Sequence, residues 1–133
     1  MSAVLVDSNV LLDIASEDPH WFDWSSQALE QAGDQSRLVV NPVIFAEVSV
    51  RFARIEDLND ALSAFDREPI PYPAAFLAGK CFLDYRGRGG EKRSPLPDFF
   101  IGAHAAVSGY RLMTRDARRY RACFPTLRLI SPD

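Results

Sequence analysis

The sequence contains only two cysteines among 133 residues, Cys81 and Cys123, and they stand far apart without a CxxC motif. Zinc sites usually need clustered cysteines and histidines, so a zinc site is disfavoured. We expect both cysteines to be core thiols of a protein in the reducing cytoplasm. The chain also lacks an apolar run as long as a membrane span, and its N-terminus lacks a basic region followed by a long apolar stretch. We therefore expect neither a membrane anchor nor a secretion signal.

The motifs of several common enzyme classes are also absent. The chain has no GxGxxG or Walker sequence that would cradle a nucleotide, and no evident Ser-His-Asp arrangement. Its two histidines are His20, at an expected helix start, and His104, which lies six positions after Asp98 and on a different helix face. Both are expected to be structural. The composition, 47% hydrophobic and 25% charged, suits one soluble domain over residues 1–133.

The net charge of -3 does not itself indicate a nucleic-acid-binding protein, but the charge is unevenly distributed. Residues 1–79 hold 4 basic and 13 acidic side chains, whereas residues 80–133 hold 11 basic and 5 acidic ones. The basic residues gather in DYRGRGGEKR and TRDARRYR. They form either an ordinary solvated surface or a face that binds a polyanion.

Short apolar runs alternate with helical patterns along the chain. This alternation predicts an α/β fold of three layers, in which a parallel sheet of about five strands has helices on both faces. The expected strand order is 3-2-1-4-5. We expect strands at 3–6, 37–40, 111–114 and 127–130, with a weak edge strand at 68–72. We expect helices at 8–15, 21–32, from Pro42 after the cap Asn41, at 56–67, 73–85, 97–108 and 116–123, and a loop at 86–95.

Four acidic residues stand where these elements begin or end. Asp7 follows the first strand, Asp98 opens a helix, and Asp116 follows the fourth strand, so each could simply cap or start a helix. Glu47 lies in a helix that is apolar nearly all round, and a buried glutamate needs a partner. That partner is either Arg51, four residues later, or a cation or shared polar site.

The predicted topology places strands 1 and 4 side by side, so Asp7 and Asp116 meet at the switch point of the sheet, where ligands bind in such folds. Four carboxylates near one sheet edge would repel each other without a positive ion. Oxygen ligands suit Mg²⁺ or Mn²⁺.

Four segments, LVDSN, NPVIFAEV, LPDFFIGAHA and LMTRDARRY, resemble the motifs of PIN-domain ribonucleases. Their order, their spacing and the chain length resemble VapC-type toxins of bacterial type II toxin–antitoxin (VapBC) pairs, and the resemblance covers the whole chain. It implies metal-dependent cleavage of RNA by an endoribonuclease. The residues matching the acidic quartet of the family are Asp7, Glu47, Asp98 and Asp116, and those matching its supporting polar positions are Ser8, Asn9 and Thr114.

On this resemblance, Asp7 and Asp98 are the first choice as ligands of Mg²⁺ or Mn²⁺, Asp116 joins directly or through water, and Glu47 orients metal-bound water or completes a second site. The expected contacts to the RNA backbone are Arg86, Arg88, Arg93, Arg115, Arg118 and Arg119. The implied partners are a small VapB-type antitoxin and a second copy of the toxin. Two helical segments, 43–52 and 58–65, either form a groove for an antitoxin helix or simply pack on the sheet.

The same residues disfavour two other functions and leave two alternatives open. A phosphatase of the haloacid-dehalogenase type needs an aspartate two positions after its nucleophile, where this chain has Asn9. A receiver domain needs adjacent acids and a late lysine, but no lysine follows Lys92. A PIN-fold nuclease of RNA processing outside a toxin–antitoxin pair stays open, as does a PIN fold used only for binding.

Overall fold

The computed structural model describes residues 2–91 and 96–132, and these contain a five-stranded sheet. The strands are β1 (Ala3–Val6), β2 (Arg37–Val40), β3 (Asp66–Arg67), β4 (Arg111–Met113) and β5 (Leu129–Ile130). All pairs are parallel and the order is β3-β2-β1-β4-β5, which confirms the predicted topology. The apolar β1 is central and wholly buried, as a strand covered on both faces must be.

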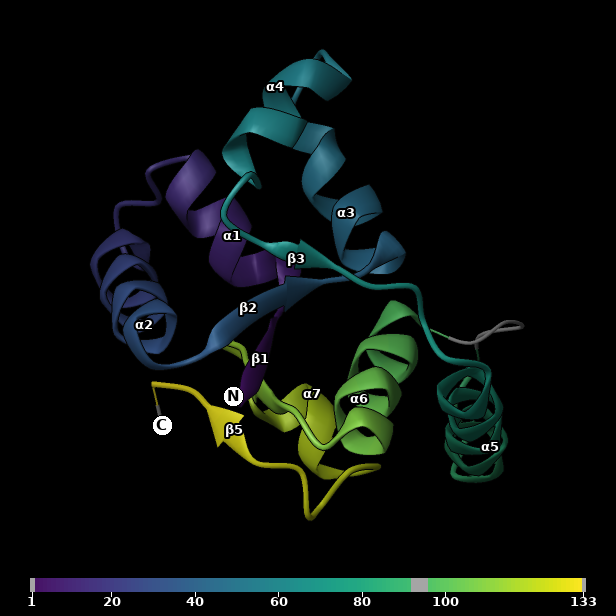
Figure 1. Cartoon of the computed structure of the whole chain (residues 1–133). Helices are drawn as coiled ribbons and strands as arrows, with labels where there is room; N and C mark the ends of the chain where they lie inside the picture. Colours follow the sequence, from purple (N-terminus) through teal and green to yellow (C-terminus); the bar gives the residue numbers. More distant parts are fainter. Residues whose placement is uncertain (1, 92–95, 133) are drawn as a thin grey trace.

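Helices cover both sides of the sheet (Figure 1). They are α1 (Ser8–Ala15), α2 (Phe22–Gln35), α3 (Pro42–Val48), a 3₁₀ turn η1 (Ser49–Arg51), α4 (Ile55–Ala61), α5 (Tyr72–Gly87), α6 (Pro97–Ser108) and α7 (Arg118–Arg121). Contacts join α1 to α2 and α3, while α6 contacts α3, α5 and α7. The helix α5 lies outermost, beside α6 (Figure 1). In the part of the chain that the structure describes, no helix is both long and apolar enough to cross a membrane.

Two helix ends follow their local signals. The side chain of Asn41 caps α3 by accepting a hydrogen bond from Ile44 N at 2.9 Å, and Pro42 occupies the first turn, as expected. Gly109 ends α6 in the left-handed conformation, with φ of 71°. The Asn41 amide also contacts Nδ1 of the buried His104 at 3.0 Å, which agrees with a structural role for that histidine.

Several expected element boundaries were wrong. The helix α2 continues through Gly33 to Gln35, and α4 ends at Ala61 instead of Arg67. The edge strand is Asp66–Arg67, not residues 68–72, because Glu68 N makes the last bond to β2 and Pro69 has no N–H to continue it. Glu47 is only half-buried, since α3 has an exposed side.

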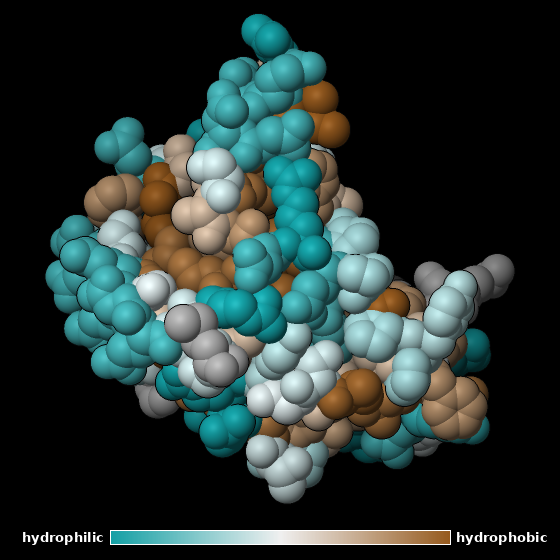
Figure 2. All heavy atoms as spheres, in the orientation of Figure 1, coloured by the Kyte–Doolittle hydropathy of each residue, from teal (hydrophilic) through white to brown (hydrophobic). Residues whose placement is uncertain are grey.

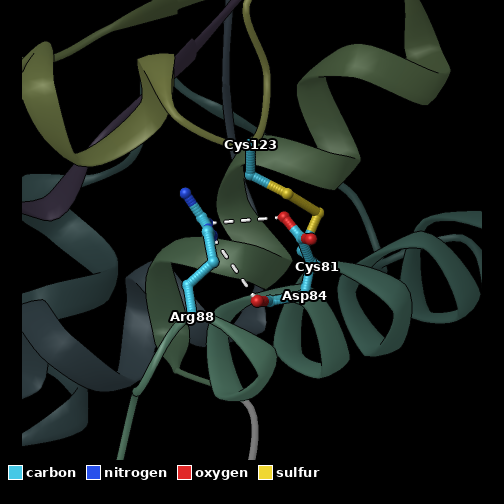
Figure 3. Close-up of a disulfide and its surroundings, with 4 residues drawn as sticks. All are labelled: Cys81, Asp84, Arg88 and Cys123. Atoms are coloured by element: carbon cyan, nitrogen blue, oxygen red, sulfur yellow. Dashed lines mark hydrogen bonds and ion pairs between the residues drawn. A yellow bond between two sulfur atoms is a disulfide. The ribbon is translucent and has the colours of Figure 1, made fainter.

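The two cysteines form a disulfide, so the expectation of free core thiols was wrong (Figure 3). Cys81 lies on α5 and Cys123 lies just after α7, 42 positions later. Because α6 packs against both α5 and α7, it brings together two cysteines that are remote in sequence. The disulfide therefore joins α5 to the segment after β4, which carries the predicted site residues Thr114, Asp116 and Arg119.

We predict opposite effects for alanine at two helical glycines. A Cβ at Gly102 in α6 would lie 2.3 Å from a ring atom of Phe124, so Gly102→Ala should lower the free energy of unfolding by about 1–3 kcal/mol. A Cβ at Gly79 in α5 meets nothing within 4 Å, so Gly79→Ala should raise that free energy by about 0.5–1 kcal/mol. Urea unfolding measures both, and equal effects of the two variants would contradict this packing.

Candidate active site

Asp7 lies at the carboxyl end of β1 and is 2% exposed. Its Oδ2 atom accepts hydrogen bonds from the hydroxyls of Thr114, at 2.9 Å, and Tyr120, at 2.8 Å. Thr114 follows β4, the neighbour of β1, so the sheet topology itself brings it to Asp7. These donors fix the orientation of the carboxylate at the predicted switch point.

The three supporting residues from the sequence lie in the same place. Ser8 Oγ donates to Oε1 of Glu47 at 2.8 Å, which links the start of α1 to α3. Asn9 donates through Nδ2 to Thr114 Oγ1 at 3.2 Å and accepts from Arg115 N at 3.3 Å. Among the described residues Glu47 forms no ion pair with Arg51, so its partner belongs to a shared polar site.

Four residues form what we call the acidic cluster, and they come from the ends of β1 and β4 and from α3 and α6: Asp7, Glu47, Asp98 and Asp116. Asp98 stands in the first turn of α6. Burial raises the pKa of its carboxyl to about 6, and the charges of the other three members add to the rise while Arg119 opposes it. The other three predicted acids therefore lie close enough to Asp98 to affect its pKa, although the elements that carry them are far apart in sequence.

Arg119 places a positive charge directly beside two members of the acidic cluster. Its Nε lies 2.9 Å from Oδ2 of Asp116, and its Nη1 lies 3.8 Å from Oδ1 of Asp98. A guanidinium in this position partly offsets the repulsion between the carboxylates. A cation bound by Asp98 and Asp116 would therefore compete with Arg119.

Tyr120 is a site residue that the sequence analysis missed. It is fully buried, and its hydroxyl lies 3.5 Å from Asp98 as well as 2.8 Å from Asp7. Burial and the neighbouring carboxylates raise its pKa, so the phenol stays protonated and donates. The available signal was a lone tyrosine in the segment RRYR, where a buried hydroxyl would need an acceptor.

The donor chemistry of the acidic cluster fits a hard divalent cation, since all its ligating atoms are oxygens. Across residues 2–91 and 96–132, however, no three acidic, histidine or cysteine groups lie close enough together to hold a metal ion as they stand. The residues fit Mg²⁺ or Mn²⁺ by the chemistry and charge of their oxygen donors, but not by their present spacing. Binding would require the carboxylates to draw together and Arg119 to move aside.

The predicted RNA-contacting arginines differ in their surroundings. Arg115 binds the buried Asp13 through Nε, at 2.9 and 3.1 Å, and its guanidinium lies 5.6 Å from the ring centre of Trp21. Asp13, which the sequence analysis did not single out, also accepts from Ser25 at 2.9 Å. Arg115 thus has a structural role in holding α1, α2 and the loop after β4 together.

The other predicted arginines that the structure describes lie near the C-terminal end of α5 and on α7. Arg86 lies over the ring of Phe82, and Arg88, the residue that caps the end of α5, pairs with Asp84 of that helix. Arg118 is exposed on α7. Arg93 lies outside the described residues. Among those predicted arginines that the structure describes, only Arg119 forms ion pairs with the acidic cluster.

A family model described as "PIN domain" matches residues 4–125. The comparison with curated proteins gives no match.

Solved structures contain chains of similar fold. One is VapBC2 from Rickettsia felis bound to a DNA fragment from their promoter, with 17% identity, a TM-score of 0.76, and coverage of 98% of this chain and 99% of that one. A toxin-antitoxin complex from Klebsiella pneumoniae gives 24% identity, a TM-score of 0.72 and coverage of 98% of both chains. FitAcB from Neisseria gonorrhoeae gives 17% identity, a TM-score of 0.72 and coverage of 97% of both chains. With a family match over nearly its whole length and the predicted strand order, the chain belongs to the PIN-domain family.

Proposed function

We propose that this protein is a metal-dependent endoribonuclease and the toxin of a toxin–antitoxin pair. The observation that carries the nuclease part is the acidic cluster, where burial and the charges of Asp7, Glu47 and Asp116 together raise the pKa of Asp98. Such a cluster is unfavourable unless it serves a cation. PIN-domain membership supports the same chemistry.

In this proposal Asp7 and Asp98 hold Mg²⁺ or Mn²⁺, and Asp116 joins directly or through water. The bound ion supplies a Lewis acid for the scissile phosphate and lowers the pKa of water. Glu47 orients the attacking water, and Ser8 fixes Glu47 through the 2.8 Å hydrogen bond. Thr114 and Tyr120 hold Asp7 in place, while Asn9 holds Thr114.

The substrate would approach from the basic side of the site. Arg86, Arg88, Arg93, Arg118 and Arg119 are proposed to contact the RNA backbone, with Arg115 acting mainly through its bond to Asp13. Phosphate contacts of this kind position a strand without reading its sequence. The test is an RNA cleavage assay of the wild type with Mg²⁺, with Mn²⁺ and with a chelator. Absence of cleavage under all metal conditions would overturn the nuclease assignment.

The toxin part rests on the structural neighbours, several of which are toxin–antitoxin complexes. A cavity of about 400 Å³ between α3, α4 and the edge strand is lined by Phe45, Ile55 and Pro69, among others. Ile55 is 59% exposed and Val50 is 77% exposed, and hydrophobic atoms reach the surface beside α4 (Figure 2). We propose that a VapB-type antitoxin helix docks here.

Co-expression tests this partner. The protein is produced with the product of a neighbouring small open reading frame, and growth and size-exclusion profiles are compared with those of the protein alone. We expect growth arrest without the partner, rescue with it, and a homodimer of this chain in the cytoplasm. A harmless, monomeric protein that captures no such product would favour a PIN nuclease outside a toxin–antitoxin pair.

The pKa of Asp98 predicts a pH-dependent metal response. A carboxylate must be deprotonated to bind a cation, and Asp98 has a pKa of about 6, so metal binding should weaken as the pH falls through 6. The rise in melting temperature caused by Mn²⁺ should therefore be clearly smaller at acidic pH, well below this pKa, than at slightly alkaline pH. In Asp98→Asn this pH dependence should be much reduced. An equal Mn²⁺ effect on the wild type at both pH values would contradict this role of Asp98.

A further inference from the structure

A second cavity, of about 480 Å³, lies directly beside the acidic cluster. Its lining includes Tyr85 from α5, Arg88 at the end of α5, Leu96, Phe99 from α6, and two residues of the site itself, Asp98 and Arg119. A ligand in this cavity would therefore touch the residues that are proposed to act on the scissile phosphate. The cavity also has the size range of small-molecule sites in proteins, which are mostly apolar with a few placed polar groups.

One wall of the cavity is a fixed aromatic surface. The ring of Tyr85 packs edge-on against Phe99, with ring centres 5.7 Å apart and planes at 66°. Gly90 lies against the same ring so closely that a Cβ there would be 2.3 Å from it. These two neighbours hold the tyrosine ring in place before any ligand arrives, and the half-buried ring still lines the cavity. A preset aromatic ring is a suitable stacking surface for an unpaired base.

Two guanidinium groups provide the polar part of the cavity. Arg88 is about half-exposed and pairs with Asp84 at 3.4 Å, one turn earlier on α5 (Figure 3). Arg119 is also about half-exposed and faces Asp98. Ion pairs at such exposed positions stabilise little, so Arg88 can exchange Asp84 for a phosphate at small cost. Arginine in particular suits phosphate because its N–H groups form a planar fork.

The disulfide sets the distance between the two sides of the cavity. Cys81 and Tyr85 are four residues apart and share one face of α5, and Arg88 caps the C-terminal end of the same helix. Cys123 lines the cavity and stands four residues after Arg119. The Cys81–Cys123 bond therefore fastens the side that carries Tyr85 and Arg88 to the side that carries Arg119 (Figure 3). Such a preformed cavity loses little ordering free energy when it binds.

We propose that this cavity binds the unpaired nucleotide adjacent to the scissile phosphate of an RNA strand. Its base packs on Tyr85, its phosphate lies between Arg88 and Arg119, and the next phosphate reaches the acidic cluster at Asp98. A strand rather than a protein segment is favoured because the cavity combines two guanidiniums with an aromatic wall and opens on the proposed catalytic carboxylates. This assignment rests on the proposed nuclease function and names its substrate contact.

The first experiment isolates the contact with the base. Binding is measured by fluorescence anisotropy in chelator, so that no cleavage occurs, using labelled oligouridylate and an abasic ribose-phosphate chain of equal length. We expect Tyr85→Leu, which keeps apolar volume but removes the ring, to weaken oligouridylate binding about tenfold. Tyr85→Phe should bind like the wild type. The abasic chain should bind all three proteins equally.

The second experiment isolates the contact with the phosphate. Arg88→Gln should lower the slope of the log–log salt dependence of oligouridylate binding by about 0.7, the value for one phosphate contact on a single strand. The matched control is Arg128→Gln, which removes the same charge from an exposed arginine outside the cavity and should leave the slope unchanged. Because Arg88 is exposed, its variant should fold even if Tyr85→Leu does not.

The outcomes separate this inference from the proposed function. If the wild type cleaves RNA but Tyr85→Leu and Arg88→Gln bind oligouridylate like the wild type, the cavity assignment is overturned and the nuclease stands. If both variants weaken antitoxin capture and leave RNA binding unchanged, the cavity belongs to a protein partner and the assignment is also overturned. If binding changes as expected but no metal supports cleavage, the cavity is a site for an unpaired nucleotide, but the nuclease proposal and the placement beside a scissile phosphate both fail.

Discussion

Asp98→Asn should reduce metal-dependent RNA cleavage by about 10²–10³-fold or more, the scale expected when a group that stabilises charge at the reacting centre is lost. Asparagine keeps the size of the side chain but removes the negative charge that a divalent cation needs. Cleavage of labelled RNA under single-turnover conditions measures the effect. The matched control is Asp57→Asn, an exposed carboxylate in the first turn of α4, which should cleave like the wild type.

The same variant has a stability signature that a merely structural acid would not show. The pKa of Asp98 is higher in the folded protein, about 6, than its usual value of 3.8. The folded state therefore binds this proton more tightly than the unfolded state, and stability is lost as the pH rises from about 4 to about 6. Metal-free Asp98→Asn should be at least as stable as the wild type at neutral pH. Marked destabilisation together with normal cleavage would identify Asp98 as a helix-starting residue only.

Reduction of the Cys81–Cys123 disulfide should lower the free energy of unfolding by about 3–4 kcal/mol. The bond closes a loop over 42 sequence positions, and closing such a loop removes conformational freedom from the unfolded chain. Urea unfolding with and without a reductant measures the difference. The effect is large because the whole stability of a domain of this size is about 5–15 kcal/mol.

The control for this measurement is the double variant Cys81→Ser/Cys123→Ser. It should unfold at the urea concentration of the reduced wild type and should not respond to the reductant. Identical unfolding curves for the oxidised and reduced wild type would show that the two cysteines are not joined in solution. A response of the double variant to the reductant would show that the effect does not come from this bond.

Much of the fold followed from local rules that the sequence alone displays. The apolar run of β1 is long enough only for a strand buried on both faces, and the alternation of such runs with helices implies a parallel sheet. Asn41, Pro42 and Gly109 mark helix ends because each depends on the conformation of a few neighbouring residues. The strand order then placed Asp7 beside the residues that follow β4.

Only the tertiary structure decided which side chains meet across large sequence separations. In the part of the chain that the structure describes, Glu47 accepts a hydrogen bond from Ser8 and forms no ion pair with Arg51, which is nearer in sequence. Tyr120 donates a hydrogen bond to Asp7 across 113 sequence positions, and Cys81 forms a disulfide with Cys123. These contacts depend on the distances and angles between packed helices, and a change of about one turn in any helix would break them. Sequence patterns record which residues face inward, since burial repeats with the period of each element. The partner that each inward polar group meets is set by how those elements pack.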